Sequence, residues 1–156
     1  MKKLILLALP AVILAAMLTT FSVHAAENTI PATNASVTFL YYKNLGDAAR
    51  FYGDILGFKK VFDGGWVKIY QIANGGRVGL VDEKKGYLKT ADDKPVMLSI
   101  DTSEVKKWYE RIKLKGPEYL KTHLKPESEG FANSFLLTDP EGYYVEFFQW
   151  NKKHEK

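Results

Sequence analysis

The sequence predicts an α+β domain that consists of two consecutive βαβββ modules, the first over about residues 37–83 and the second over about residues 95–150. Strand-like and helix-like segments follow one another in the same order in both halves. Residues of similar type also recur 57 positions apart at the two expected helices: Asn44 with Asp101, Phe51 with Trp108, and Ile55 with Ile112. Because the two halves agree in the order of their elements, in the residue type at the helix start and in the apolar stripe of the helix, we interpret the chain as a duplicated unit.

Residues 1–25 have the features of a secretory signal peptide. A short basic start precedes an almost continuously apolar stretch over residues 4–18, and Val23-His24-Ala25 matches the pattern of a cleavage site. An uncleaved membrane anchor is the alternative, but the apolar stretch is shorter than the ~20 residues that span a bilayer, and it contains Pro10. We therefore expect a protein secreted across the inner membrane into the periplasm, with no stable membrane anchor after cleavage.

The composition argues against nucleic acid as a partner. The net charge of +4 would fall to +2 once Lys2 and Lys3 leave with the signal peptide, and no block dense in Lys and Arg with interleaved aromatic residues follows. The chain has no cysteine, so packing alone must stabilise the fold in a compartment that would permit disulfides. The chain that remains after cleavage is long enough for one domain with a single core.

The first module follows a polar segment over residues 26–36, which we interpret as a flexible lead-in. Asn44 is a typical helix cap, and the apolar stripe behind it ends before Gly57, which tolerates a left-handed C-terminal conformation. Glycine turns of the hairpin type separate the strands that come after the helix. The expected strands are VTFLYY (37–42), FKKVFD (58–63), WVKIYQI (66–72) and RVGLVDE (77–83).

A charged connection over residues 84–94, either a solvated linker or a lid, leads to the second module. Asp101 to Glu104 has the pattern of a capping box, and Gly116-Pro117 ends the helical stripe that follows. The expected strands are PVMLSI (95–100), YLKTHL (119–124), FANSFLLT (131–138) and, after a DPEG turn, YYVEFFQW (143–150). Residues 151–156 form a charged tail.

Two stretches of this chain resemble the vicinal oxygen chelate superfamily, which includes glyoxalase I, bleomycin-resistance proteins, fosfomycin-resistance enzymes and extradiol dioxygenases. Residues 44–58, NLGDAARFYGDILGF, are similar to the signature D-L-x-x-A-x-x-F-Y-x-x-x-L-G-F of that family. Residues 138–150, TDPEGYYVEFFQW, are similar to its D-P-x-G-x-x-x-E-F ending. The resemblance covers residues 37–150, and it implies two modules whose sheets curl around a common cleft, usually in a homodimer.

The resemblance also implies where a metal would bind, because metalloenzymes of this family take up to four ligands from the first and fourth strands of each module. The corresponding positions here are Val37, Gly79, Lys94 or Pro95, and Glu146. Aliphatic side chains and glycine cannot coordinate a divalent ion, which usually takes three or four protein ligands. We therefore expect no metal and no other cofactor. His123 faces either the cleft or the solvent, and the sequence leaves both possibilities open.

The candidate site is built around Glu146, an acid that interrupts an otherwise apolar strand. Alternate residues of a strand share a face, so the resemblance directs a further set of side chains toward the cleft: Phe39, Tyr41, Met97, Ser99, Tyr144 and Phe148. Such a lining suits a small, partly apolar ligand that carries a donor or a positive charge. The alternative is that the aromatic residues fill the core and that Glu146 is solvated or accepts structural hydrogen bonds.

Three functions fit these observations, and the sequence leaves open whether the chain is an enzyme. The first is an exported protein that binds a small ligand in an aromatic cleft without metal, as expected from its resemblance to bleomycin-resistance proteins. The alternative is a lyase or isomerase of the glyoxalase type in which Glu146 is the catalytic base, with or without a metal held by atypical ligands. The third is a structural or partner-binding role for a fold that has lost its site.

Overall fold

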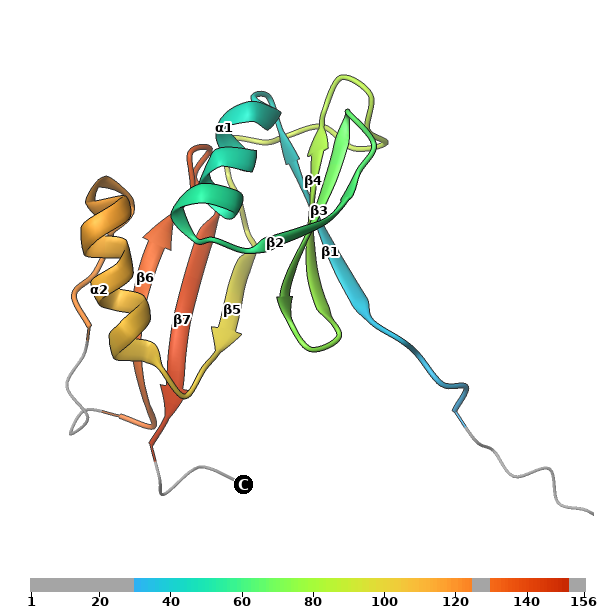
Figure 1. The fold of residues 1–156 in the computed structure, drawn as a ribbon. Coiled ribbons are helices and arrows are strands. Elements are labelled where there is room, and N and C mark those ends of the chain that lie inside the picture. Colours follow the sequence, from blue (N-terminus) through green and yellow to red (C-terminus); the bar gives the residue numbers. More distant parts are fainter. Residues whose placement is uncertain (1–29, 125–129, 152–156) are drawn as a thin grey trace, which may run out of the picture. The chain divides into compact units, whose positions relative to one another are not determined.

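The computed structural model describes residues 30–124 and 130–151, and the described residues from Thr33 onward belong to one compact unit. Two sheets, of four and three strands, and few helices make up this unit, which confirms the α+β class and the two modules (Figure 1). Within the described ranges, none of the helices combines the length and the apolarity that a bilayer crossing requires. The expected signal peptide and residues 152–156 of the expected tail lie outside the described residues.

The first module forms a sheet with the strand order β1-β4-β3-β2, in which β1 and β4 run parallel and the other neighbours run antiparallel. Glycines with positive φ, Gly65 (78°) and Gly75 (74°), form the two turns between the last three strands, as the glycine-rich sequence predicts. The strands are β1 (Ser36–Tyr42), β2 (Lys59–Asp63), β3 (Val67–Ala73) and β4 (Gly76–Asp82).

Helix α1 (Leu45–Arg50) connects β1 to β2 and continues as a π-helical turn, η1 (Phe51–Ile55). Asn44 begins the helix as expected, because its Oδ1 accepts hydrogen bonds from two backbone N–H groups of the first turn at 3.1 and 3.2 Å. At the other end, Arg111 Nε donates to the carbonyl oxygens of Ile55 (3.0 Å) and Leu56 (3.2 Å). The guanidinium therefore satisfies acceptors that have no partner within the helix and complements the negative end of its dipole.

The second module forms a sheet with the order β5-β7-β6, in which β5 and β7 run parallel and β6 and β7 antiparallel. Its strands are β5 (Met97–Asp101), β6 (Ala132–Thr138) and β7 (Tyr144–Trp150). Helix α2 (Val105–Lys115) follows β5, and a short 3-10 helix, η2 (Pro117–Tyr119), follows α2. The parallel pairing of first and last strands therefore recurs in both modules, which agrees with the internal repeat.

Two local expectations for the second module were wrong. The strand expected over residues 119–124 is reduced to one bridge between Leu120 and Leu137, since the chain leaves α2 through a 3-10 turn that Pro117 begins. Thr122 Oγ1 then accepts the backbone N–H of Leu136 at 2.9 Å, so a side chain takes the place of a ladder bond. The expected capping box does not form either, because Asp101 ends β5 and the helix begins only at Val105.

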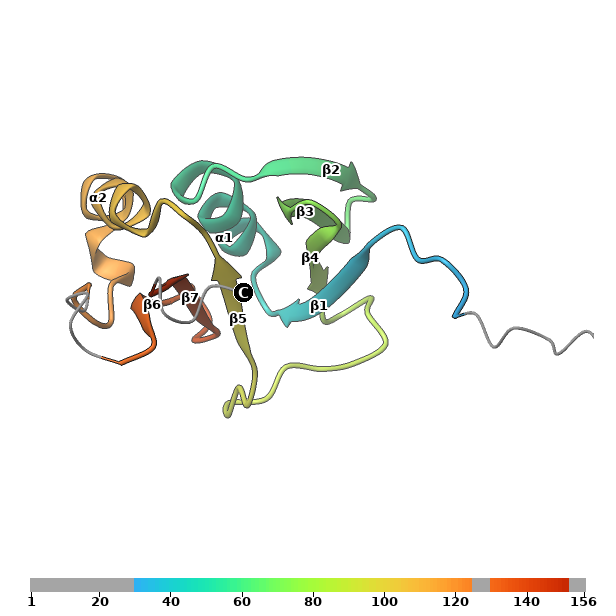
Figure 2. The same cartoon turned by 90° about the horizontal axis from the view of Figure 1, so that it is seen from below.

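Each sheet has one face covered by a helix of its own module. Helix α2 lies along one face of the β5-β7-β6 sheet (Figures 1 and 2), and α1 accepts a hydrogen bond from β3, from Tyr70 Oη to Ala49 O at 3.3 Å. Burial alternates along β6 and the first part of β7, and the covered faces supply the core, which includes Leu40, Tyr42, Phe51, Tyr52, Val78, Leu80, Ile112, Phe135, Leu137, Val145 and Phe147. Each fully buried apolar side chain stabilises the fold by roughly 1.5–3 kcal/mol. The opposite faces are left open.

The DPEG turn between β6 and β7 joins the two modules through hydrogen bonds. Asp139 Oδ2 accepts the hydroxyl of Tyr42 on β1 at 2.7 Å, while its Oδ1 accepts the backbone N–H groups of Glu141 (3.0 Å) and Tyr143 (2.9 Å). The Tyr143 hydroxyl in turn donates to the carbonyl oxygen of Tyr41 at 3.1 Å. A turn of the second module is thereby fixed to the end of the first strand of the first module.

This connection buries ionisable groups. Asp139 is only 5% exposed, and burial raises the pKa of its carboxyl, although three hydrogen bonds to the carboxylate act in the opposite direction. Burial also raises the pKa of the Tyr42 hydroxyl, which keeps this group protonated as a donor. The connection therefore has a titratable member, and its stability depends on pH.

We expect the stability of the Asp139→Asn variant to depend less on pH than the stability of wild type does. The pKa of Asp139 is higher in the folded state than in the unfolded chain, so the unfolded chain loses this proton first as pH rises. The contribution of the protonated group to folding stability is therefore complete below pH ~3.8. That contribution is lost as pH rises through the folded-state pKa. Asparagine has a similar shape and does not titrate. Urea unfolding of both proteins between pH 3.5 and pH 7 should show wild type losing stability relative to the variant as pH rises.

A second variant tests the same connection. Tyr42→Phe removes the hydroxyl that donates to Asp139, leaves a buried acceptor less satisfied and should cost about 1–3 kcal/mol of stability at neutral pH. It should also extend the loss of stability to higher pH, since the carboxylate has one donor fewer. Stability curves for wild type and Asp139→Asn that stay parallel over the whole range would contradict this account.

Candidate functional site

The open face of the second sheet carries the candidate site. Strand register places Ser99 beside Glu146 and Met97 beside Tyr144 on the parallel pair β5 and β7. Alternate residues along β7, at positions 144, 146, 148 and 150, share this face because the intervening Val145 and Phe147 are fully buried on the side of α2. The face that lies away from the helix is thus made of polar and aromatic side chains in neighbouring rows.

A hollow of about 460 Å³ lies on this open face. Its lining combines aromatic rings, one thioether, two hydroxyls and one carboxylate, and comes from all three strands and the segment that leads into β6. The lining residues are Met97, Ser99, Gly130, Phe131, Ala132, Ser134, Glu146, Phe148 and Trp150. Its volume lies in the range of sites for small molecules.

Among the described residues that line the hollow, Glu146 is the one with a charged side chain. Its side chain is half-buried, and its Oε2 accepts a hydrogen bond from Ser99 Oγ at 2.9 Å. This hydroxyl comes from the neighbouring strand and orients the carboxylate without neutralising it. Most of the acceptor capacity of the carboxylate therefore remains available, since an ionised carboxyl group has about four lone-pair sites.

Three aromatic rings form one wall of the hollow. Trp150 contacts Phe148 edge to face, with ring centroids 5.2 Å apart, and contacts Phe131 in a tilted arrangement at 5.9 Å. Asn151 holds the end of this wall together, because its backbone N–H donates to Phe131 O at 3.0 Å and its side chain donates to Gly130 O at 2.8 Å. The rings are therefore fixed against one another before any ligand arrives.

The structure brings four of the seven candidate residues together in this hollow: Met97, Ser99, Glu146 and Phe148. Tyr144 lies on the same face of β7, exposed and outside the lining. Phe39 and Tyr41 lie on the open face of the other sheet, where the Tyr41 ring packs beside Gly86.

Five lining residues of the hollow are absent from the candidate set, and two of these, Trp150 and Phe131, carry aromatic rings. Trp150 has the same parity along β7 as Glu146 and Phe148, so the alternation rule alone could have found it. Phe131 precedes β6, and only the return of the chain beside the end of β7 brings its ring to Trp150. No pattern in the sequence indicates that contact.

The positions where relatives would hold a metal do not provide a matching set of donors. The ring of Phe39 lies over Gly79, where a Cβ atom would be only 2.4 Å from Phe39 Cδ1. Glu146 has no second carboxylate or imidazole among the lining residues, and the described part of the chain contains no group of three or more His, Cys, Asp or Glu that could hold an ion. His123 is hydrogen-bonded through Nδ1 to the hydroxyl of Tyr109 on α2, at 3.1 Å. These residues do not fit a divalent ion.

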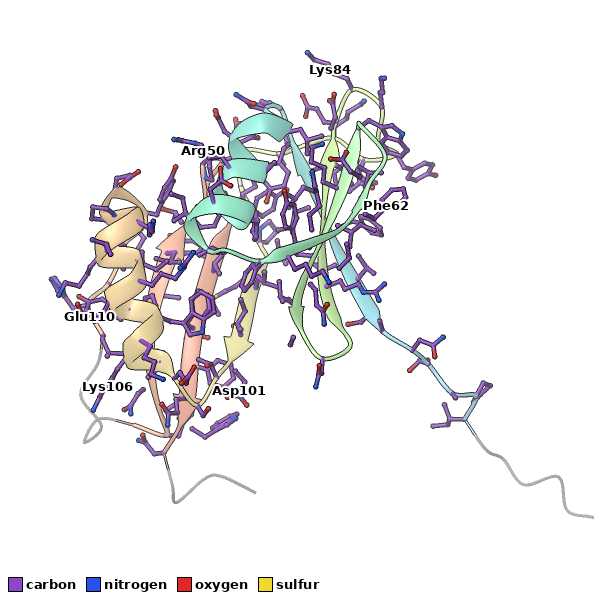
Figure 3. All side chains as sticks on the ribbon, in the orientation of Figure 1. Arg50, Phe62, Lys84, Asp101, Lys106 and Glu110 are labelled. Atoms are coloured by element: carbon purple, nitrogen blue, oxygen red, sulfur yellow. The ribbon has the colours of Figure 1, made fainter. Side chains whose placement is uncertain are left out.

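The open face of the first sheet is mostly apolar and aromatic, with the polar pair Arg77 and Gln71 toward one end. Pairing places Phe39, Gly79, Ile69 and Phe62 in one row across β1, β4, β3 and β2. Phe62 lies on the side of the sheet away from α1 (Figure 3), and Phe39 shares this side because Leu40 and Tyr42 are buried in the core. This row has no acid corresponding to Glu146.

Comparisons with known proteins agree with this fold. Residues 33–147 match the family model described as Glyoxalase/Bleomycin resistance protein/Dioxygenase superfamily. None of the curated proteins matches the sequence. Among solved structures, lactoylglutathione lyase from Agrobacterium tumefaciens is similar, with 21% identity and a TM-score of 0.57 over 77% of this chain and 96% of that one.

Two further structures show the same fold. A glyoxalase/bleomycin resistance protein/dioxygenase from Nocardioides has 20% identity and a TM-score of 0.60, with 80% of this chain and 88% of that one covered. TioX from Micromonospora sp. ML1 has 18% identity and a TM-score of 0.62, with 76% and 99% covered. Identities this low establish the fold alone. Because the family model spans most of the chain, the protein belongs to the Glyoxalase/Bleomycin resistance protein/Dioxygenase superfamily.

Proposed function

We propose that this protein binds a small, partly apolar ligand in the hollow on the open face of the second sheet, without a metal. The single observation that carries the proposal is the combination in one hollow of a packed aromatic wall with one oriented carboxylate, Glu146. Apolar walls with a few placed polar groups are the usual composition of small-molecule sites. A ligand ring that stacks on this wall gains roughly 0.5–1.5 kcal/mol beyond the burial of its surface.

The residues around Glu146 favour a binding function over a catalytic one. A general base works best with a second group that stabilises the charge formed in the reaction, such as a metal, an imidazole or a cationic side chain. The described residues that line the hollow include neither an imidazole nor a cationic side chain. The name of the lactoylglutathione lyase from Agrobacterium tumefaciens motivates the enzymatic alternative, and the oriented carboxylate is the observation in its favour.

We also propose that the protein acts in the periplasm. The support is the sequence of residues 1–25, with its basic start, apolar stretch and small residues before the cleavage point. A binding protein in that compartment would meet its ligand outside the inner membrane. Expression of the full chain followed by cell fractionation and mass determination of the mature N-terminus would test this assignment.

A homodimer would complete the site. Large apolar side chains on both open faces, Phe39, Phe62, Met97 and Tyr144, are between 42% and 51% exposed. A two-fold axis that places the first sheet of one copy against the second sheet of the other would cover both faces with one repeated contact. The aromatic row of β1 to β4 would then form the wall opposite the hollow.

The Trp150→Ala and Phe148→Ala variants test the site with an uncharged fluorescent probe, N-phenyl-1-naphthylamine. Each variant should bind the probe about five- to tenfold more weakly, because each removes one face of the aromatic wall. Tyr87→Ala is the matched control, since it removes an exposed aromatic ring that does not line the hollow. Equal probe affinity in all four proteins would exclude this hollow as the site.

The enzymatic alternative has a separate test. If the protein turned over lactoylglutathione or a related thioester, Glu146→Gln should lower kcat by at least about a hundredfold, the usual contribution of a general base. We expect no turnover by wild type, and therefore no difference between the two proteins in a spectrophotometric thioester assay. Activity of wild type that disappears in Glu146→Gln would replace the binding function with the catalytic one.

The dimer is tested by light scattering on the purified mature protein. We expect a mass twice that of the chain at micromolar concentration, and a shift toward the monomer in Phe39→Asp, because a charge in the apolar row opposes its burial. Tyr87→Asp places the same charge on an exposed loop and should leave the dimer intact. A single-chain mass at all concentrations up to 100 μM would contradict the homodimer.

A further inference from the structure

The charge on the open face of the second sheet differs in sign from that of the chain as a whole. Lysine and arginine number 22 in this sequence and exceed the acids, and α2 alone carries Lys106, Lys107, Arg111, Lys113 and Lys115. The open face of β5, β6 and β7 has no basic residue at its described positions, which are Met97, Ser99, Asp101, Ala132, Ser134, Leu136, Thr138, Tyr144, Glu146, Phe148 and Trp150.

Two carboxylates lie on this same face. Glu146 lines the hollow, and Asp101 stands beside Phe148 in the register of β5 and β7, at the end of β5 (Figure 3). The ring of Phe148 therefore has a carboxylate on its own strand two residues away and another on the neighbouring strand. Aromatic faces carry negative potential, which adds to that of the two acids.

The carboxylates and aromatic rings on this face make the binding free energy depend on the charge of the ligand. A ligand that seals the hollow from water removes solvent from the Glu146 carboxylate, which has one hydrogen bond, from Ser99, to offset that loss. A neutral ligand leaves the carboxylate poorly compensated, and an anion adds repulsion. A cation removes the cost and also gains from the rings of Trp150 and Phe148.

We propose that the ligand is an organic cation, an amine or quaternary ammonium group on an aromatic or alkyl body, with the positive charge held between Glu146 and the rings of Phe148 and Trp150. The inference rests on the proposed binding function of the hollow and specifies the class of ligand. The apolar body contacts Met97 and Phe131 at the two sides of the hollow. A protonated amine donates hydrogen bonds to the acceptor sites of Glu146 that Ser99 leaves open, whereas a quaternary ammonium group interacts with the same carboxylate by charge alone.

Three probes of similar shape and different charge test this inference: benzyltrimethylammonium, its uncharged carbon isostere neopentylbenzene, and phenylacetate. Affinities are measured by NMR titration of the mature protein. The cation should bind at least about tenfold more tightly than the isostere, and phenylacetate most weakly. Glu146→Gln should remove most of the preference for the cation, because it weakens cation binding and relieves the neutral isostere of the cost of desolvating a carboxylate.

Two controls separate charge at the site from charge elsewhere and from misfolding. Glu110→Gln makes the same change on the outer side of α2 (Figure 3) and should leave all three affinities unchanged. Thermal unfolding of Glu146→Gln should match that of wild type, because the half-exposed side chain keeps its shape.

The possible outcomes distinguish this inference from the proposed function. Equal affinity for the cation and the isostere, unaffected by Glu146→Gln, would overturn the cationic ligand and leave the aromatic binding site standing. Preference for phenylacetate would also overturn it. If none of the three probes binds at millimolar concentration and the uncharged fluorescent probe is insensitive to Trp150→Ala, both the ligand class and the binding site are wrong.

Discussion

Each sheet of this protein can be covered on only one face by the helix of its own module, and the chemistry of the molecule follows from that constraint. Strand alternation sends one set of side chains into the core and the other set to the open face. On β7 the buried set is Val145 and Phe147, while the open set is Tyr144, Glu146, Phe148 and Trp150. Glu146 can therefore lie in an apolar strand without full burial, because it belongs to the face that no helix covers.

The DPEG turn gives this arrangement its rigidity. Asp139 binds two backbone N–H groups of its own turn and the hydroxyl of Tyr42, so that the start of β7 and the end of β1 are fixed by one carboxyl group. Burial makes the group costly to ionise, yet three donors converge on it, and such networks specify one arrangement when fully satisfied. The strand that carries Glu146 thus begins at a point anchored in both modules.

Sequence patterns predict the fold well because they record local requirements. Asn44 caps α1, glycines form the hairpin turns, and the predicted repeat is present as a sheet with its own helix in each module. The prediction of a strand over residues 119–124 was wrong, because its β-like composition does not indicate the 3-10 turn at Pro117. It also does not indicate that the Thr122 hydroxyl takes the place of a backbone acceptor in the sheet. In the site, alternation finds Met97, Ser99, Glu146 and Phe148, whereas Phe131 depends on a tertiary contact that no periodicity encodes.

The two open faces differ at the equivalent positions of β7 and β4 where the family would place a metal ligand. Where β7 has Glu146, β4 has Gly79, and the missing side chain leaves space that the ring of Phe39 fills. A ring packed on a glycine cannot coexist with a metal-binding side chain at that position, since even a Cβ atom would overlap it. The first sheet therefore contributes apolar surface and the second contributes charge. In the proposed binding site, recognition would therefore combine stacking on apolar surface with electrostatic complementarity to the carboxylate.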